Sequence, residues 1–332
     1  MRKLIGRTCL ALGATAIALL LGEVVIRAMG LAPAFTSVPF GEYVVSDDPE
    51  LLWELRPGAD GVNELGLRGP PLANPPAQLR VALLGDSVAY GLGLQGDETI
   101  AVRLQAHLRE AGLDAEVLNL GVAGYNTCQE ARRLERLQPV IHADAVVLVF
   151  CLNDFAASAG IPEAVLRAAR QGGAGEALQL SYRVATGSAV MRTLMTCSHL
   201  FRLIHELACT EGTAVQGGKA RDRASGDDTE VAQGFARIAR LARAAGVGVT
   251  VAIMPSFERS PVYKEHPLHE RAGALARKAG FAVLDLEEPL RGALLSGDEP
   301  LSLPGDGVHP NALGADLAAQ AIATGIAGRA QK

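Results

Sequence analysis

Short apolar runs alternate with longer amphipathic stretches along most of the chain after residue 80. Runs rich in Val, Leu, Ile and Ala predict five strands, at residues 81–84, 116–119, 145–150, 247–254 and 281–286. Apolar residues at helical spacing predict helices at residues 98–111, 129–137, 230–245, 268–278 and 311–326. Three of these helices are followed by a glycine, as expected for a helix stop. Alternation of this kind predicts a mostly parallel five-stranded sheet covered by helices on both faces, a three-layer α/β/α domain.

One long interval, residues 155–229, interrupts the alternation directly after the third predicted strand. It contains helical-looking pieces at 162–170 and 190–207 and a polar, Gly-rich stretch at 210–228. Because parallel strands end at the same edge of a sheet, we expect this insertion to cover that edge as a helical cap or lid. Residues 80–330 then form one domain that contains the cap.

Residues 30–79 form an extension whose many prolines and glycines exclude long regular elements. Trp53, the only tryptophan, is expected to anchor the extension against the domain as a hydrophobic plug. Arg68 lies in a loop that could approach the site. It is either a substrate contact or one partner of a surface salt bridge, and we favour the salt bridge.

The first 29 residues predict a membrane anchor. Three basic residues precede an apolar run that continues to about residue 26, and a helix of about 20 residues spans a bilayer. Glu23 and Arg27 are four residues apart and are expected to pair on one helix face. Because the basic residues come first, the rest of the chain should lie outside the cytoplasm. The alternative is a secreted protein cleaved after Ala32-Pro33-Ala34, a site far beyond the apolar region.

Composition removes several classes of function. The net charge is −5, with 31 basic and 36 acidic residues mixed along the chain. No basic stripe is present, so we expect no nucleic-acid partner.

The Gly-x-Gly-x-x-Gly pattern at residues 91–96 begins several residues after the first predicted strand, which argues against dinucleotide binding.

The cysteines and histidines of the insertion raise the question of a metal. Cys197, His199, His205 and Cys209 are close in sequence, and His205 and Cys209 are four residues apart. No carboxylate or second cysteine pair reinforces this spacing, so we predict no metal and no cofactor. A disulfide between Cys197 and Cys209 is left open, although one straight helix would hold the two cysteines too far apart.

The first predicted strand runs through a Gly-Asp turn into Ser87, which places a hydroxyl at the edge where α/β proteins bind ligands. Ser87 is either a turn residue or a nucleophile, and a nucleophile needs a base, a group that orients the base, and donors for an oxyanion. His309 fits the base because it follows the last predicted strand and precedes the last helix. Asp306, three residues earlier, can accept a hydrogen bond from the imidazole.

The remaining histidines compete less well for the role of base. They are placed inside a helix, on the amino side of the sheet, in the insertion, or beside Pro267 near a helix start: His107, His142, His199, His205, His266 and His269.

Two further loops offer oxyanion donors. Gly124 follows the second predicted strand and Asn153 follows the third. A glycine N–H and an asparagine amide at this edge can complete an oxyanion hole with the N–H of Ser87. Gly121 lies in the same loop and is the alternative glycine, but we prefer Gly124.

Taken together, these residues make the chain resemble the SGNH (GDSL-type) hydrolases. Gly85-Asp86-Ser87 is similar to the first sequence block of that family, and the loop that holds Gly124 is similar to the second. Asn153-Asp154 is similar to the third block and Asp306-x-x-His309 to the fifth, so the resemblance covers residues 80–327.

The resemblance implies a flavodoxin-like α/β/α fold in which Ser87 is the nucleophile, His309 the base and Asp306 its orienter. Ser87, Gly124 and Asn153 would hold the oxyanion, and no residue is assigned to substrate binding. One departure concerns Cys151, which stands where the family usually has a glycine. A side chain there could narrow the pocket or shift Asn153.

The activity implied is hydrolysis of an acyl ester through an acyl-enzyme. An O-acetyl ester is one candidate, and an acylated carbohydrate or lipid is a candidate substrate. Two alternatives stay open: an O-acyltransferase to carbohydrate that uses the same residues, and a membrane-anchored binding or assembly protein with a degenerate site. The Asn-x-x-Gly-x-Arg segment at residues 63–68 and the predicted anchor are similar to membrane-anchored family members, some of them associated with polysaccharide modification.

Overall fold

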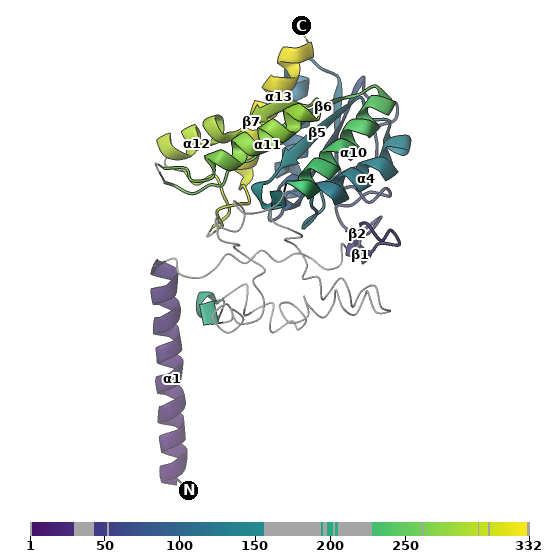
Figure 1. Cartoon of the computed structure of the whole chain (residues 1–332). Coiled ribbons are helices and arrows are strands. Elements are labelled where there is room, and N and C mark those ends of the chain that lie inside the picture. Colours follow the sequence, from purple (N-terminus) through teal and green to yellow (C-terminus); the bar gives the residue numbers. More distant parts are fainter. Residues whose placement is uncertain are drawn as a thin grey trace.

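The computed structural model describes residues 2–29, 43–51, 53–155, 194, 198–201, 203–204, 228–260, 262–297, 299–304 and 306–330. Most of these residues form a three-layer α/β/α domain around a central sheet (Figure 1). The greater part of the predicted cap lies outside the described residues, and so do Cys197, His205 and Cys209. The cap, the disulfide and the division of the chain at residues 30 and 80 stay predictions.

The central sheet contains five parallel strands, all at the predicted positions: β3 (Leu79–Gly85), β4 (Ala115–Asn119), β5 (Ala145–Phe150), β6 (Gly248–Ile253) and β7 (Ala282–Asp285). Their spatial order is β4-β3-β5-β6-β7. In this flavodoxin-like order the direction of winding reverses between β3 and β5. Ligands bind at the carboxyl ends of the strands at such a switch point, and this is where the candidate residues after β3 and β5 lie.

Helices cover both faces of the sheet (Figure 1). One face packs against α4 (Thr127–Ile141), α10 (Thr229–Ala245) and α11 (His266–Lys278). The other packs against α3 (Ile100–Glu110), α12 (Glu287–Ser296) and α13 (Ala312–Ala330). Because side chains alternate across a strand, Ala82 and Leu84 of β3 enter the first core while Val81 and Leu83 enter the second. Both cores are therefore anchored on the strand that leads to Ser87.

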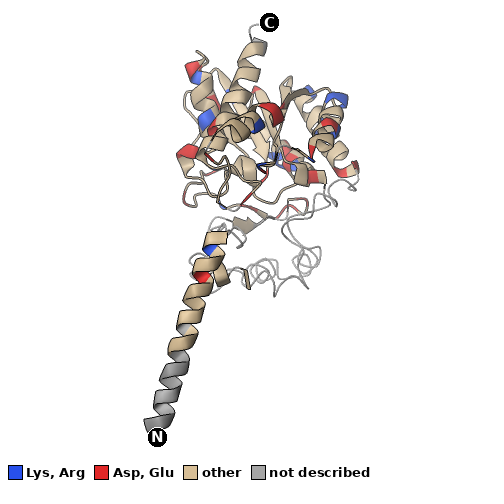
Figure 2. Ribbon diagram, turned by 90° about the vertical axis from the view of Figure 1, so that its left-hand side faces the viewer, with Lys and Arg blue, Asp and Glu red and all other residues tan. Residues whose placement is uncertain are grey.

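Three short helices connect these elements at the carboxyl edge of the sheet: α2 (Ser87–Tyr90), η2 (Gly96–Glu98) and η3 (Leu152–Phe155). Acidic and basic residues are mixed over the described part of the domain (Figure 2).

The N-terminal residues form a single helix, α1 (Arg2–Met29), that projects from the domain (Figure 1). The predicted pair between Glu23 and Arg27 is confirmed, with 2.7 Å between the carboxylate and the guanidinium. Glu23 also accepts hydrogen bonds from the Ser198 hydroxyl and from the N–H groups of His199 and Leu200, at 2.8–2.9 Å.

Among the described residues, no helix combines the length and the apolar character that a membrane crossing requires. The transmembrane helix predicted within residues 1–29 is therefore not supported, although a helix does form there.

The extension contains a small hairpin that the sequence did not predict, made of β1 (Tyr43–Val45) and β2 (Trp53–Leu55). Trp53 is buried, its indole N–H donates to the Ala123 carbonyl at 3.1 Å, and its ring meets Tyr125 edge-on at 5.4 Å. The prediction that Trp53 anchors the extension against the domain is confirmed.

Arg68 has a different role from either alternative considered above. Its guanidinium donates to the carbonyl oxygens of Tyr90, Gly91 and Leu94 at 3.0, 2.6 and 2.6 Å and lies over the Tyr90 ring. The predicted surface salt bridge is wrong, because the two terminal nitrogens of the guanidinium donate instead to backbone carbonyls at the end of α2 and in the turn that follows it. Arg68 thus fixes the helix that begins at Ser87.

Candidate active site

Ser87 owes its position to a tight turn between β3 and α2. A Cβ at Gly85, whose φ is +147°, would lie 2.6 Å from the Ala89 Cβ and 2.8 Å from the Val149 carbonyl oxygen, so only glycine fits. Asp86 caps the helix, and its carboxylate accepts from the Val88 N–H at 2.9 Å. Ser87 is therefore the first residue of a short helix, half-buried at the carboxyl edge of the sheet.

The structure brings Ser87, His309 and Asp306 into one hydrogen-bonded chain. Ser87 Oγ lies 2.8 Å from His309 Nε2, and His309 Nδ1 lies 2.7 Å from Asp306 Oδ2. The other oxygen of Asp306 accepts from the N–H groups of Val308 and His309 at 2.7 and 3.0 Å. Both carboxylate oxygens are therefore bonded, which fixes the orientation of the imidazole. We call Asp306 and His309 the His309 pair.

Backbone hydrogen bonds hold the turn that carries the His309 pair. The Leu303 N–H donates to the His309 carbonyl at 3.0 Å, and the Phe257 N–H donates to the Gly307 carbonyl at 2.7 Å. The turn does not follow the last strand directly, because α12, which the sequence did not predict, comes first. The last helix begins at Ala312, and Asn311 caps it by accepting from the Gly314 N–H at 2.9 Å. Pro310 therefore lies two residues before the first helical residue.

The charges around His309 favour its protonated form. Burial opposes that charge, but the hydrogen bond that the ring donates to Asp306 and the charges of Asp306 and Asp86 outweigh it, so the pKa of His309 is raised. Burial likewise opposes charge on Asp306, but the bonds to His309 prevail and lower its pKa. The arrangement stabilises an imidazolium beside a carboxylate, the state that follows when a base takes a proton.

Asn153, on η3 after β5, turns its side chain towards the loop that holds Ser87. Its Nδ2 donates one hydrogen bond to Asp86 Oδ2 at 3.0 Å. An amide nitrogen carries two N–H groups, so the second can serve another acceptor. Asp86 thus orients Asn153 as well as capping α2, a role that the sequence analysis missed.

The structure distinguishes the two glycines of the second loop. The Gly121 N–H already donates to Asn119 Oδ1 at 3.0 Å, and a Cβ at this position would lie 2.4 Å from the Tyr90 nitrogen. Gly121 therefore serves the close packing of the loop against α2. Gly124 is half-buried, with φ of +83°, and the use of the Gly121 N–H elsewhere favours Gly124 as the donor.

A buried acidic cluster lies beside these residues. Asp154 accepts from the Thr127 hydroxyl at 2.6 Å, and Glu130 is buried on α4. Burial and the neighbouring carboxylates raise the pKa of Glu130 and of Asp154 well above their usual values. The Cys151 thiol, whose pKa burial also raises, donates to Asp86 Oδ1 at 3.2 Å. Cys151 therefore joins Asn153 in bonding to Asp86.

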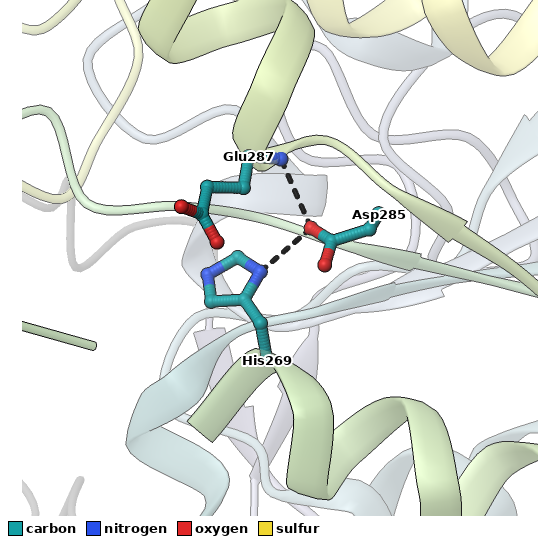
Figure 3. A group of neighbouring side chains, drawn as sticks. All are labelled: His269, Asp285 and Glu287. Atoms are coloured by element: carbon teal, nitrogen blue, oxygen red, sulfur yellow. Dashed lines mark hydrogen bonds and ion pairs between the residues drawn. The ribbon is translucent and has the colours of Figure 1, made fainter. Parts of the chain in front are cut away.

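A second imidazole–carboxylate pair, His269 and Asp285, lies on α11 and at the end of β7 (Figure 3). We call it the His269 pair. His269 Nδ1 is 2.7 Å from Asp285 Oδ1, and His269 Nε2 is 2.9 Å from the Tyr263 hydroxyl. Asp285 Oδ1 also accepts from the Glu287 N–H at 3.0 Å, as Figure 3 shows. Both ring nitrogens of His269 are thus bonded to groups other than a serine.

The same region contains a group of potential metal ligands. Within the described residues, ligand atoms of His269, Asp285 and Glu287 lie within 4.8 Å of one another (Figure 3). Their mutual hydrogen bonds and the bond from His269 to Tyr263 account for this arrangement without a metal. His199, from the weak metal motif of the insertion, lies against Glu23 instead, 3.4 Å from its carboxylate.

A hydroxyl, an imidazole and a carboxylate bonded in sequence are the arrangement by which serine hydrolases are recognised. Residues 83–317 match the model of the "GDSL-like Lipase/Acylhydrolase family". The chain belongs to this family and is a hydrolase that acts on ester bonds. The five-stranded parallel sheet with helices on both faces confirms the predicted three-layer α/β/α architecture.

Several solved structures are similar to the chain at low identity. The crystal structure of TesA is 18% identical, with 73% of this chain and 95% of TesA covered and a TM-score of 0.44. The esterase EstA from Pseudoalteromonas sp. is 13% identical, with coverages of 76% and 99% and a TM-score of 0.43. The acetyl xylan esterase AlAXEase is 13% identical, with coverages of 75% and 100% and a TM-score of 0.43. No curated protein matches the chain. The family assignment rests on the family model and not on these structures.

Proposed function

We propose that the protein hydrolyses its ester through an acyl-enzyme formed on Ser87. The observation that carries this proposal is the bonded chain from Asp306 through His309 to Ser87 Oγ, with distances of 2.7 and 2.8 Å. The 2.8 Å between Ser87 Oγ and His309 Nε2 lies within the range over which a base takes a proton from a nucleophile, and the 2.7 Å bond to Asp306 orients that base.

In the first half-reaction His309 Nε2 takes the proton of Ser87 Oγ as this oxygen bonds to the acyl carbon. The carbonyl electrons move onto the oxygen, where the N–H groups of Ser87, Gly124 and Asn153 stabilise the negative charge. Collapse of the intermediate breaks the bond to the leaving alcohol, which takes the proton from His309. Water repeats the sequence on the acyl-enzyme, releases the acid and restores Ser87.

The test combines active-site labelling with turnover. We expect a fluorophosphonate probe to label the wild-type protein at Ser87 and not Ser87→Ala, with the modified peptide identified by mass spectrometry. A panel of p-nitrophenyl esters and acetylated sugars should then be hydrolysed. A folded wild-type protein that neither labels nor turns over any ester would reject the proposal and favour the anchored binding protein.

The acyltransferase alternative uses the same acyl-enzyme with a sugar hydroxyl in place of water. Incubation with an ester donor and a sugar acceptor separates the two reactions, because transfer yields an acylated sugar and hydrolysis yields free acid. We expect mainly free acid. Acylated sugar formed faster than acid would replace the hydrolase proposal with a transferase.

We also propose that the domain works outside the cytoplasm, a proposal supported by the basic residues that precede the apolar N-terminal run. Protease added to spheroplasts of cells that express the full chain should digest the domain. A domain that sediments with membranes would indicate a retained anchor, and a shortened soluble form would indicate cleavage. Protection of the domain until the cells are lysed would refute the proposal.

A further inference from the structure

A small cavity lies next to the candidate active site, with Asn153 in its wall. Its wall includes Val88, which follows Ser87, Val308, which precedes His309, and Asn153. Cys151 and Met254 also line it. The lining therefore includes one proposed oxyanion donor and the chain neighbours of the nucleophile and the base.

The acyl substituent of the substrate needs a space of its own next to Ser87. In the tetrahedral intermediate the oxyanion faces its donors and the leaving oxygen faces His309, so the acyl substituent takes the remaining direction from the carbon. The cavity next to Asn153 and Val88 offers space for a group bonded to that carbon.

The cavity is small and its apolar walls are firmly packed. Its volume is about 20 Å³, whereas a single water-sized group needs about 10–15 Å³ on the same measure. Val88, Cys151 and Met254 are all buried, and the Cys151 thiol is tied to Asp86 at 3.2 Å. Walls packed at the density of a protein interior do not yield to extra methylene groups without cost.

The rest of the lining also disfavours a long chain. Leu152, Pro255, Ser256 and Glu265 complete the wall, and two of these four residues are polar. An alkyl chain pressed against the half-buried Ser256 would remove it from water without replacing its hydrogen bonds. A methyl group is small enough to occupy the apolar part of the cavity without contacting its polar residues.

We propose that this cavity is the acyl subsite and that it admits an acetyl group, with Cys151 and Met254 setting its depth. The inference rests on the proposed acyl-enzyme at Ser87. It assigns a function to the Cys151 side chain, which the sequence marked only as a departure from the family pattern.

The test compares kcat/KM for p-nitrophenyl acetate, butyrate and octanoate. We expect the wild type to prefer acetate to butyrate by at least about 10–200-fold, the discrimination that one extra methylene group can produce in a tight pocket. Met254→Ala and Cys151→Ala should each lower the acetate-to-butyrate ratio by about tenfold or more. Met254→Ala enlarges the cavity and keeps the bond between Cys151 and Asp86.

Leu294→Ala is the matched control, because Leu294 is buried in the same core as Met254 but does not line the cavity. It should leave the ratio at the wild-type value, with folding of every variant checked by circular dichroism. Wild-type protein that hydrolyses butyrate or octanoate as fast as acetate overturns the inference, whatever the variants do. The inference is also overturned if the acetate-to-butyrate ratio is the same in both cavity variants as in the Leu294→Ala control.

Failure of the inference and failure of the proposed function give different results. A protein that labels with fluorophosphonate and hydrolyses esters without chain-length preference keeps the acyl-enzyme and loses the acetyl-sized subsite. A protein that neither labels nor hydrolyses any ester loses both.

Discussion

The protein contains two imidazole–carboxylate pairs with almost the same geometry and different surroundings. In the His309 pair the ring nitrogens lie 2.7 Å from the carboxylate and 2.8 Å from the Ser87 hydroxyl. In the His269 pair the corresponding distances are 2.7 Å and, to the Tyr263 hydroxyl, 2.9 Å. The imidazole–carboxylate bond therefore does not by itself distinguish a catalytic base from a structural histidine.

The difference lies in the hydroxyl and in access to the ring. The His309 side chain is 18% exposed and the His269 side chain is 0% exposed. The Tyr263 hydroxyl accepts the Ser256 N–H at 3.1 Å, and burial raises its pKa, so it is a poor nucleophile. Ser87 begins a helix at the sheet edge beside Asn153. A nucleophile therefore requires accessible space and oxyanion donors in addition to a paired histidine.

The largest expected effect separates the two hydroxyls. Ser87→Ala should lower kcat for p-nitrophenyl acetate by about 10⁴–10⁶-fold, because the acyl-enzyme cannot form. Tyr263→Phe, the matched removal of the other hydroxyl, should change kcat by less than about tenfold. Steady-state kinetics on both purified variants measure these values. A kcat of Ser87→Ala within about a hundredfold of the wild-type kcat would show that another residue attacks the acyl carbon.

A smaller effect should separate the two carboxylates. Asp306→Asn should lower kcat by about 10²–10⁴-fold, since the amide no longer stabilises the imidazolium. Asp285→Asn should leave kcat within about tenfold of the wild-type value. It should instead lower the free energy of unfolding by about 1–3 kcal/mol, because it weakens the hydrogen bonds to a buried imidazole and to a helix N-terminus. Urea denaturation gives the second value. The reverse result, with activity lost in Asp285→Asn alone, would exchange the roles of the two pairs.

The next effect should come from the proposed oxyanion donors, which act only in the reaction at Ser87. Asn153→Ala should lower kcat by about 10²–10³-fold while leaving the fold intact. Circular dichroism and thermal unfolding serve as the control, because Asp86 loses one hydrogen-bond donor in this variant. Turnover close to that of wild type would remove Asn153 from the oxyanion hole.

The smallest effect is a shift on the pH axis. His309 must be neutral to accept a proton, and its pKa is raised, so kcat/KM should fall with decreasing pH at a midpoint above about 6.5. Asp306→Asn removes the main cause of the raised pKa, so the midpoint should move to lower pH. The residual activity of Asp306→Asn, measured from pH 5 to 9, gives the comparison, and an unchanged midpoint would assign the acid limb to another group.

The sequence predicted the five strands and most of the helices because their signals are local. Apolar runs and helical spacing placed every strand of the sheet, and parallel topology then brought Ser87, Asn153 and His309 to one edge. Helix α12 was missed because Pro289 and Gly292 interrupt its pattern. The β1–β2 hairpin was missed because its strands are three residues each, too short for a periodic signal.

The missed residues of the site depend on contacts between distant segments. The bonds from Asn153 to Asp86 and between His269 and Asp285 link residues on different elements, and no spacing rule connects them. Arg68 was assigned by its charge to a surface pair, whereas its partners are backbone carbonyls, which the sequence of side chains does not reveal. Side-chain chemistry in the sequence identified the reactive groups better than it identified the residues that position them.

The three carbonyl bonds of Arg68 have a consequence for how the protein can be divided. A fragment that begins at residue 80 keeps every residue proposed to take part in the chemistry, but it loses the Arg68 guanidinium that bonds to the end of α2. Thermal fluctuation of that short helix would then move the serine hydroxyl relative to the imidazole. Grafting this hydrolase onto another protein would therefore mean moving residues 53–69 along with it, even though none of them touches the reacting atoms in the proposed mechanism.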